Sequence, residues 1–213
     1  MIYKAIIFDL DGVICHTDKY HYLAWKQLAD KLGIYFDEQI NNRLRGVSRM
    51  DSLEIILERY QGEPLTQEEK ESLATEKNEI YKKFLLQMSP EDLSREVRDT
   101  LNQLRNLGIQ LAIGSSSKNA RLILKQIGLG DYFDAVSDGN NISHSKPNPE
   151  VFLKAAAFLK KSPKDCLVVE DAVAGIEAAH AGNMDSAGLG EAADYHLTTY
   201  RLASFSELLN IFQ

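Results

Sequence analysis

The sequence has few cysteines, no excess of positive charge and no long apolar run, and each of these absences narrows its possible functions. Cys15 and Cys166 are the only cysteines among 213 residues, and their spacing fits neither a metal-binding nor a redox pair, so we expect a reduced, cytoplasmic setting. The net charge of −7 argues against a nucleic-acid partner and an anionic membrane surface. The first apolar stretch ends at Asp9, which makes it too short to cross a bilayer, and it lacks the basic start of a signal peptide.

The sequence also lacks internal repeats and low-complexity tracts, and its composition is that of an ordinary globular protein. Hydrophobic residues make up 44% and charged residues 26% of the chain, which is enough to form a sizeable core. A length of 213 residues fits a core domain with a smaller domain inserted into it.

Short apolar segments alternate with helical patterns over most of the chain. The first, Tyr3 to Phe8, is almost entirely apolar, which is typical of a strand buried on both faces. The later expected elements are a helix at 96–106, a strand at 109–114, a helix at 118–128, a strand at 133–138, a helix at 148–161, a strand at 165–171, a helix at 172–181 and a weak strand at 184–188. This alternation predicts an α/β fold with a doubly wound parallel sheet.

Residues 17–88 follow a different pattern, in which apolar residues recur at helical spacing and no convincing strand occurs. One of these helices is expected to begin at Thr66, where Thr66 and Glu69 have the spacing of a capping box. The sequence therefore predicts a core domain of residues 1–16 and 89–213, interrupted by an all-helical domain of residues 17–88.

Two aspartates, Asp9 and Asp11, follow the first predicted strand directly, and Gly12 comes after them. Residues two apart in an extended chain point to the same side, so both carboxylates would face one site. Two carboxylates so close repel each other unless a cation lies between them. An ordinary Asp-Gly turn explains this stretch about equally well.

Polar residues also follow the other predicted strands, at the edge of the sheet where ligands bind in open α/β folds. They are the hydroxyl-rich loop Ser115 to Asn119, then Lys146, then Glu170 and Asp171. Read singly, helix capping or a solvated lysine accounts for each. Together they predict a site for Mg²⁺ and a phosphate, in which Asp9 attacks phosphorus and Asp11 acts as general acid and base.

These stretches, "DLDGV", "GSSSKN", "SKPNPEVF" and the Glu-Asp pair, resemble the four motifs of the haloacid dehalogenase superfamily. With "HTDKYHYLAWK" and "RGVSRMDSL" the chain is most similar to the β-phosphoglucomutases, which interconvert β-D-glucose 1-phosphate and glucose 6-phosphate through β-glucose 1,6-bisphosphate. The resemblance implies a small phosphorylated sugar as partner, Mg²⁺ as cofactor, the bisphosphate as activator, and a monomer.

The resemblance also implies roles for individual residues. Asp9 would be the nucleophile and Asp11 the acid and base, with Asp9, Asp11, Glu170 and Asp171 around the metal. Ser115, Ser116, Asn119 and Lys146 would hold the transferring phosphate. In the helical block, which would be the family's cap domain, the implied substrate residues are Thr17, His21, Trp25, Arg45, Gly46, Ser48, Arg49, Ser52 and Lys77.

Several readings stay open for the cap residues and for the activity. Trp25 also fits core packing, Ser48 a helix cap and Lys77 a solvated surface, whereas Arg49 in a first helical turn is disfavoured by the helix dipole, which favours an anion-binding role. Arg45 stands where the mutases have lysine, and "DLSREV" lacks their Pro-Gly pair. The alternatives to a mutase are a sugar-phosphate phosphatase and a receiver-like signalling module, although receivers lack so large an insertion.

Overall fold

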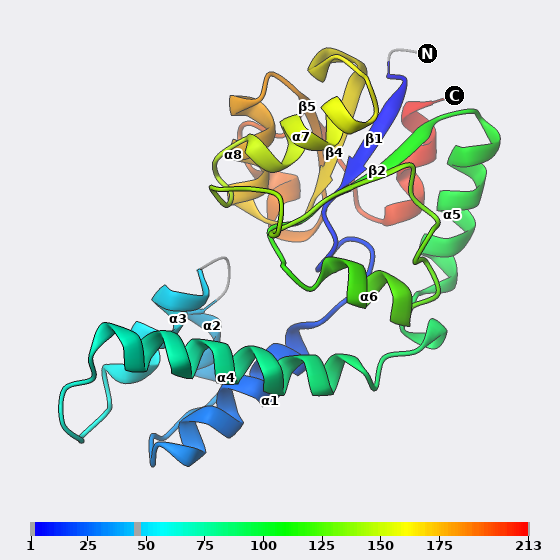
Figure 1. Cartoon of the computed structure of the whole chain (residues 1–213). Coiled ribbons are helices and arrows are strands. Elements are labelled where there is room, and N and C mark those ends of the chain that lie inside the picture. The colour runs from blue at the N-terminus through cyan, green and yellow to red at the C-terminus, as the bar shows by residue number, and fades with distance from the viewer. Residues whose placement is uncertain (1–2, 45–47, 213) are drawn as a thin grey trace. The chain divides into compact units, whose positions relative to one another are not determined.

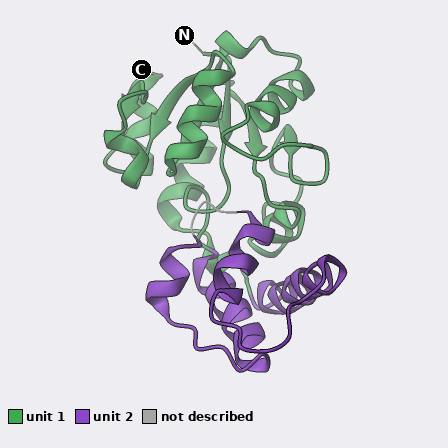
Figure 2. Cartoon of the chain, turned by 90° about the vertical axis from the view of Figure 1, so that its left-hand side faces the viewer, with its two compact units in different colours: residues 1–16, 88–213 green, residues 17–87 purple. Residues whose placement is uncertain are grey.

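The chain divides into two units in the computed structural model, which describes residues 3–44 and 48–212. We call residues 1–16 and 88–213 the core unit and residues 17–87 the helical unit, coloured green and purple in Figure 2.

The core unit is built on a parallel six-stranded sheet with the order β3-β2-β1-β4-β5-β6, which confirms the predicted α/β fold (Figure 1). The chain leaves β1 on one side through β2 and β3 and then crosses to β4 on its other side, so the order reverses between β1 and β4. Ligands bind at such a switch point, beyond the carboxyl ends of the strands. The strands are β1 (Ala5–Phe8), β2 (Gln110–Gly114), β3 (Ala135–Ser137), β4 (Cys166–Glu170), β5 (Asp185–Gly188) and β6 (Tyr200–Arg201).

Helical segments cover both faces of this sheet. On one face α7 packs against β1, β2 and β3 while α8 packs against β4 and β5, and Phe152 joins Ile7 and Val168 in a buried cluster. On the other face the ring of Phe8 stacks on Phe205 of the short helix η4, with ring centroids 5.7 Å apart, and η4 packs against α5. The segments are η1 (Pro90–Asp92), α5 (Arg95–Asn106), α6 (Ala120–Gln126), α7 (Glu150–Phe158), η2 (Pro163–Asp165), α8 (Val173–Ala181), η3 (Gly190–Asp194) and η4 (Phe205–Ile211).

The sequence pattern located most of these elements but missed the shortest ones. The helix expected at 148–161 is shorter at both ends, because Pro149 opens α7 and Lys160 turns into a left-handed conformation with a φ of 56°. Strand β6 was not predicted, since two residues, Tyr200 and Arg201, are too few for alternation to be recognised.

The helical unit contains α1 (Asp18–Lys31), α2 (Glu38–Asn42), α3 (Arg49–Leu57) and α4 (Gln67–Leu85). Helices α1 and α3 both pack against α4, and the unit has its own apolar core, in which Trp25, Leu28 and Ile56 are buried. The predicted capping box is confirmed: Thr66 and Glu69 bond each other's backbone N–H groups at the start of α4. Helix α2 was not predicted separately, because it has only five residues, with Asp37 as its N-cap.

The described residues, 3–44 and 48–212, contain no helix whose length and apolar character would let it cross a membrane.

Candidate active site

Three of the predicted carboxylates meet beyond β1 and β4. Phe8 is paired with Val169, and the backbone N–H of Asp9 donates to the Val169 carbonyl at 2.9 Å, so Asp9 lies beside the last residue of β4, Glu170. Asp9, Glu170 and Asp171 each offer an oxygen within 4.8 Å of the others. The register of two parallel strands thus brings together acids that are about 160 positions apart in the sequence.

Lys146 neutralises part of this acidic group. Its ammonium donates to the carboxylates of both Asp9 and Glu170 and lies 4.6 Å from the ring centroid of Phe152. Burial alone would lower the pKa of Lys146, but the negative charges of Asp9 and Glu170 raise it above the usual lysine range. The lysine therefore stays charged, and its position between two carboxylates is fixed by two charge-assisted hydrogen bonds.

One cation does not satisfy all the negative charge of the site. Burial raises the pKa of Asp171 to about 7, and the nearby charges of Asp9, Glu170 and Asp11 add to this effect. Crowded carboxylates take up protons in this way when no metal ion screens them. The donors are hard oxygen atoms, which Mg²⁺ prefers, so the residues present fit a Mg²⁺ ion.

Two glycines leave room for these carboxylates. A Cβ atom at Gly12, whose φ is +91°, would lie 1.9 Å from Asp171 Oδ2. A Cβ atom at Gly175 in α8 would lie 2.0 Å from Glu170 Oε1. Sequence reasoning missed Gly175, although an interior helix glycine shortly after an acidic strand end was an available signal. Both acids are therefore packed directly against backbone.

The loop after β2 is pinned to the loop after β3. The N–H groups of Ser115 and Gly139 donate to the carbonyls of Ser137 and Ser117, at 3.0 and 3.1 Å. Within the described part of the chain, the Oγ atom of Ser116 is buried and has no hydrogen-bond partner.

The same loop is organised by its own hydroxyl groups. Ser115 Oγ accepts from the Ser117 N–H, and Ser117 Oγ accepts from the N–H of Asn119, which is buried at the start of α6; both distances are 3.2 Å. From the sequence, Ser117 was considered only as a helix N-cap; in the structure the capping position of α6 is Asn119. A loop of hydroxyl groups at a helix start suits an anion, as the sequence indicated.

Asp11 lies on the tight turn that follows β1. Its backbone bridges to Cys15, and the Gly12 N–H donates to the Cys15 carbonyl at 2.7 Å. The side chain of Asp11 is partly buried, and its charge contributes to the raised pKa of Asp171.

The helical unit holds a second polar group, in which a buried lysine has no ion pair with a carboxylate in the part of the chain that the structure describes. Lys77 is only 2% exposed; its ammonium lies 2.9 Å from His21 Nδ1 and 4.7 Å from the ring centroids of both Trp25 and Tyr81. Burial, together with the charge of Arg49, lowers the pKa of Lys77 to about 7.

His21 is held neutral in the same group. Burial lowers its pKa well below the usual histidine value, and the charges of Lys77 and Arg49 act in the same direction. While Lys77 is charged, its ammonium group only donates hydrogen bonds, so Nδ1 of His21 accepts and the ring hydrogen lies on Nε2.

The other predicted residues of the helical unit differ in burial and in their hydrogen-bond partners. Arg49 is partly buried and donates to Asn78 Oδ1 at 2.9 Å. Thr17, Trp25 and Ser52 are buried; Thr17 accepts from the Tyr81 hydroxyl at 3.0 Å. Ser48 caps α3 by accepting from the Asp51 N–H. Arg45 and Gly46 lie outside the described residues.

Comparison with known proteins matches the chain to one family model and to several named enzymes. The family model described as haloacid dehalogenase-like hydrolase matches residues 3–183. β-Phosphoglucomutase of Bacillus subtilis is 44% identical over 189 residues, which cover 88% of this chain and 84% of the relative. Fructose-1-phosphate phosphatase YqaB of Escherichia coli is 34% identical over 185 residues, 86% of this chain and 95% of the relative. A crystal structure of β-phosphoglucomutase from Clostridium difficile has a TM-score of 0.85 and 37% identity, and covers 97% of this chain and 93% of that one.

We predict that Gly175→Ala weakens Mg²⁺ binding by about 10-fold or more, because the new Cβ atom would displace the Glu170 carboxylate. Calorimetric titration with Mg²⁺ measures this. Gly130→Ala is the matched control, since a Cβ atom there would meet Lys125 atoms no closer than 3.7 Å. Equal affinity of the Gly175 variant and the wild type would show that Glu170 takes no part in holding the ion.

We also predict that Lys77→Met stabilises the protein. The pKa of Lys77 is lowered from 10.5 in the unfolded chain to about 7 in the fold. Between pH 7 and pH 10.5 the unfolded chain therefore binds one proton more than the folded chain, and below pH 7 the folded chain bears the full cost of burying the charge. The gain in free energy of unfolding should therefore be largest below pH 7, roughly 1 kcal/mol or more, and should vanish as the pH approaches 10.5. Urea titrations across this range measure it, and a loss of stability at pH 6 would contradict the assignment.

Proposed function

Because the chain belongs to the haloacid dehalogenase-like hydrolase family, we propose that it is a phosphosugar mutase that interconverts β-D-glucose 1-phosphate and glucose 6-phosphate. One observation supports a mutase over a simple phosphatase. Besides the carboxylate site of the core unit, the helical unit buries a cationic group of its own, Lys77 with Arg49 close by. An enzyme that acts on a bisphosphate must bind two phosphates, whereas a phosphatase needs to bind one.

In the proposed reaction a carboxylate oxygen of Asp9 attacks phosphorus of β-glucose 1,6-bisphosphate, and the bond between phosphorus and the sugar oxygen breaks. Asp11 gives its proton to the departing oxygen. In the second half, Asp11 takes the proton of a hydroxyl on the monophosphate, which then attacks phosphorus and releases the Asp9 carboxylate. The two halves exchange the phosphorylated position and return both aspartates to their starting states.

The other core residues prepare this exchange. Lys146, charged and held against Asp9, lowers the repulsion between the nucleophile and the phosphate. Ser115, Ser116 and Asn119 would orient the transferring phosphoryl group, which would also give the buried hydroxyl of Ser116 a partner.

Asp9, Glu170, Asp171 and the backbone carbonyl of Asp11 would hold Mg²⁺. When bound, the ion neutralises charge on the phosphoryl oxygens and on the acidic group. The bisphosphate acts as activator in this scheme, because it phosphorylates Asp9.

A sugar-phosphate phosphatase is the second candidate, since a relative named as a fructose-1-phosphate phosphatase is 34% identical. In that case water, rather than a sugar hydroxyl, would attack the phosphorylated Asp9. The two functions differ in product: one gives an isomer and the other gives free phosphate.

One assay tests the proposal directly. The protein is supplied with β-glucose 1-phosphate, Mg²⁺ and a catalytic amount of β-glucose 1,6-bisphosphate, and glucose 6-phosphate and free phosphate are followed together. A mutase forms glucose 6-phosphate far faster than phosphate. Steady release of phosphate without isomerisation would establish the phosphatase instead.

We predict that Asp9→Asn lowers kcat by at least about a thousand-fold, because an amide cannot replace the carboxylate nucleophile. Circular dichroism should show an unchanged fold. Wild-type turnover in this variant would remove Asp9 from the role of nucleophile.

We predict that Arg49→Ala lowers kcat/KM for the mutase reaction by about 10- to 100-fold, which corresponds to the free energy of one charge-assisted hydrogen bond to phosphate. Hydrolysis of an aryl phosphate should be affected much less. The smaller substrate carries no second phosphate. Arg43→Ala is the matched control, because Arg43 pairs with Glu58 on the exposed surface of the same unit. Equal losses for both substrates would count against a second phosphate-binding group.

A further inference from the structure

Glu150, in the first turn of α7, holds the segment that carries Lys146. One of its carboxylate oxygens, Oε2, accepts the backbone N–H groups of Ser143 at 2.9 Å and of His144 at 2.8 Å. These two residues come just before Lys146, in the stretch between β3 and α7. Glu150 thus attaches the loop to the first turn of α7, and the point of attachment on the loop lies just before Lys146.

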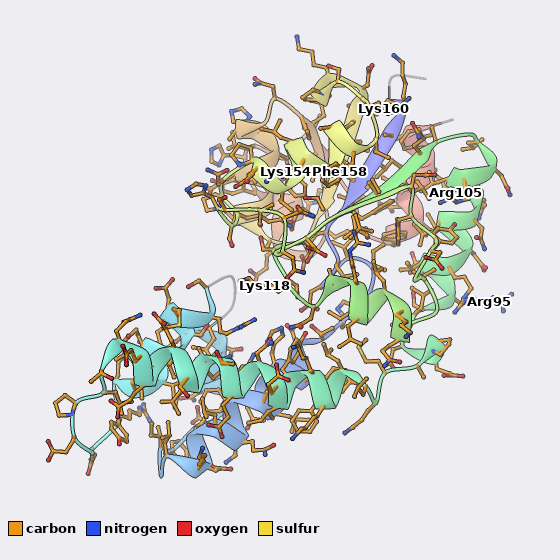
Figure 3. All side chains as sticks on the ribbon, viewed as in Figure 1. Arg95, Arg105, Lys118, Lys154, Phe158 and Lys160 are labelled. Atoms are coloured by element: carbon orange, nitrogen blue, oxygen red, sulfur yellow. The ribbon has the colours of Figure 1, made fainter. Side chains whose placement is uncertain are left out.

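The second oxygen of Glu150 is held by its own helix. Oε1 forms an ion pair with Lys154 Nζ at 2.8 Å, and Lys154, labelled in Figure 3, also donates to the Asn141 carbonyl. The hydrogen bond from Lys154 and the N–H groups of His144 and Ser143 lower the pKa of Glu150 to about 2. Glu150 is therefore ionised throughout the neutral range, and both of its oxygens are occupied.

Helix α7 contacts Lys146 in a second way. Phe152, two residues after Glu150 and fully buried, places its ring 4.6 Å from the Lys146 ammonium. That ammonium must reach Asp9 and Glu170 at once, so its position tolerates little displacement. Residues 138–149, all of them described, form no regular helix or strand. A turn holds Lys146 locally, with the Asn148 N–H donating to the Ser145 carbonyl at 3.1 Å, and Glu150 connects the residues just before this turn to α7.

We propose that Glu150 is a positioning residue for Lys146: its carboxylate fixes the loop so that the ammonium lies between Asp9 and Glu170. This inference rests on the proposed function, in which Lys146 assists transfer of phosphate to Asp9. Displacement of a charged group by about 1 Å at a reacting centre costs on the order of 100-fold in rate. The residue acts on the reaction only through Lys146 and does not itself touch the substrate.

A double-mutant cycle of Glu150→Ala with Lys146→Ala tests this, using hydrolysis of p-nitrophenyl phosphate as the readout. Glu150→Ala should lower kcat by about 10- to 100-fold with a smaller change in KM. In the Lys146→Ala background the same substitution should cost less than about 3-fold, because the group it positions is gone. A residue that only stabilised the fold would lower activity equally in both backgrounds, and that result would overturn the proposal.

Glu96→Ala is the matched control. Glu96 also lies in the first turn of a core-unit helix and accepts a backbone N–H from a distant segment, that of Ser206 at 2.9 Å, but this segment carries no site residue. Its kcat should stay within about 2-fold of the wild type. An equal loss in the two alanine variants would contradict a specific role for Glu150.

Two conservative variants test whether a loss of activity in Glu150→Ala comes from misfolding. Glu150→Gln keeps the size of the side chain and one acceptor oxygen, and Glu150→Asp keeps the charge; both should fold with a Tm near that of the wild type and recover part of the activity. No recovery by either folded variant would count against the proposal. If the wild type hydrolyses the aryl phosphate but does not isomerise glucose phosphates, the mutase proposal fails while the cycle still decides the role of Glu150.

Discussion

The structure depends on one constraint: several carboxylates lie together at the carboxyl edge of a parallel sheet, and their mutual repulsion must be offset. Lys146 meets part of this constraint by donating to Asp9 and Glu170 together. The pKa of Asp171, raised to about 7, shows that negative charge remains in excess. A buried carboxylate without a cationic partner lowers the stability of the fold. The site is therefore better explained as a binding site for a further cation than as an element that stabilises the sheet.

The helical unit contains the opposite case, a buried cation that forms no ion pair with any carboxylate among the described residues. Lys77 is surrounded by aromatic rings and a neutral histidine, and its pKa is lowered to about 7. Such a group weakens the fold, which makes a role in binding an anion the simplest reason for its presence. Within each unit, the residues that reduce stability are therefore those to which we assign binding or chemistry.

Much of the fold was predictable because local patterns determine it. The apolar strand Tyr3 to Phe8, the alternation after residue 89 and the capping box at Thr66 predicted the sheet and the helices. The meeting of Asp9 with Glu170 followed from sheet topology. Gly175 left a signal in the sequence, an interior helix glycine shortly after an acidic strand end. The contact of Glu150 with its loop left none, because tertiary structure decides which loop packs against that carboxylate. The contact of Lys77 with the rings of Trp25 and Tyr81 and with His21 depends likewise on how α1 and α4 pack.

The central claim is that Asp9, Glu170 and Asp171 form the site of one divalent cation next to the nucleophile. A crystal structure grown with Mn²⁺, which can replace Mg²⁺ and gives an anomalous signal, tests it most directly. We expect a single strong anomalous peak within coordination distance of oxygen atoms from Asp9 and Asp171, with Lys146 still against Asp9. A peak elsewhere in the core unit, or none at saturating Mn²⁺, would contradict the account.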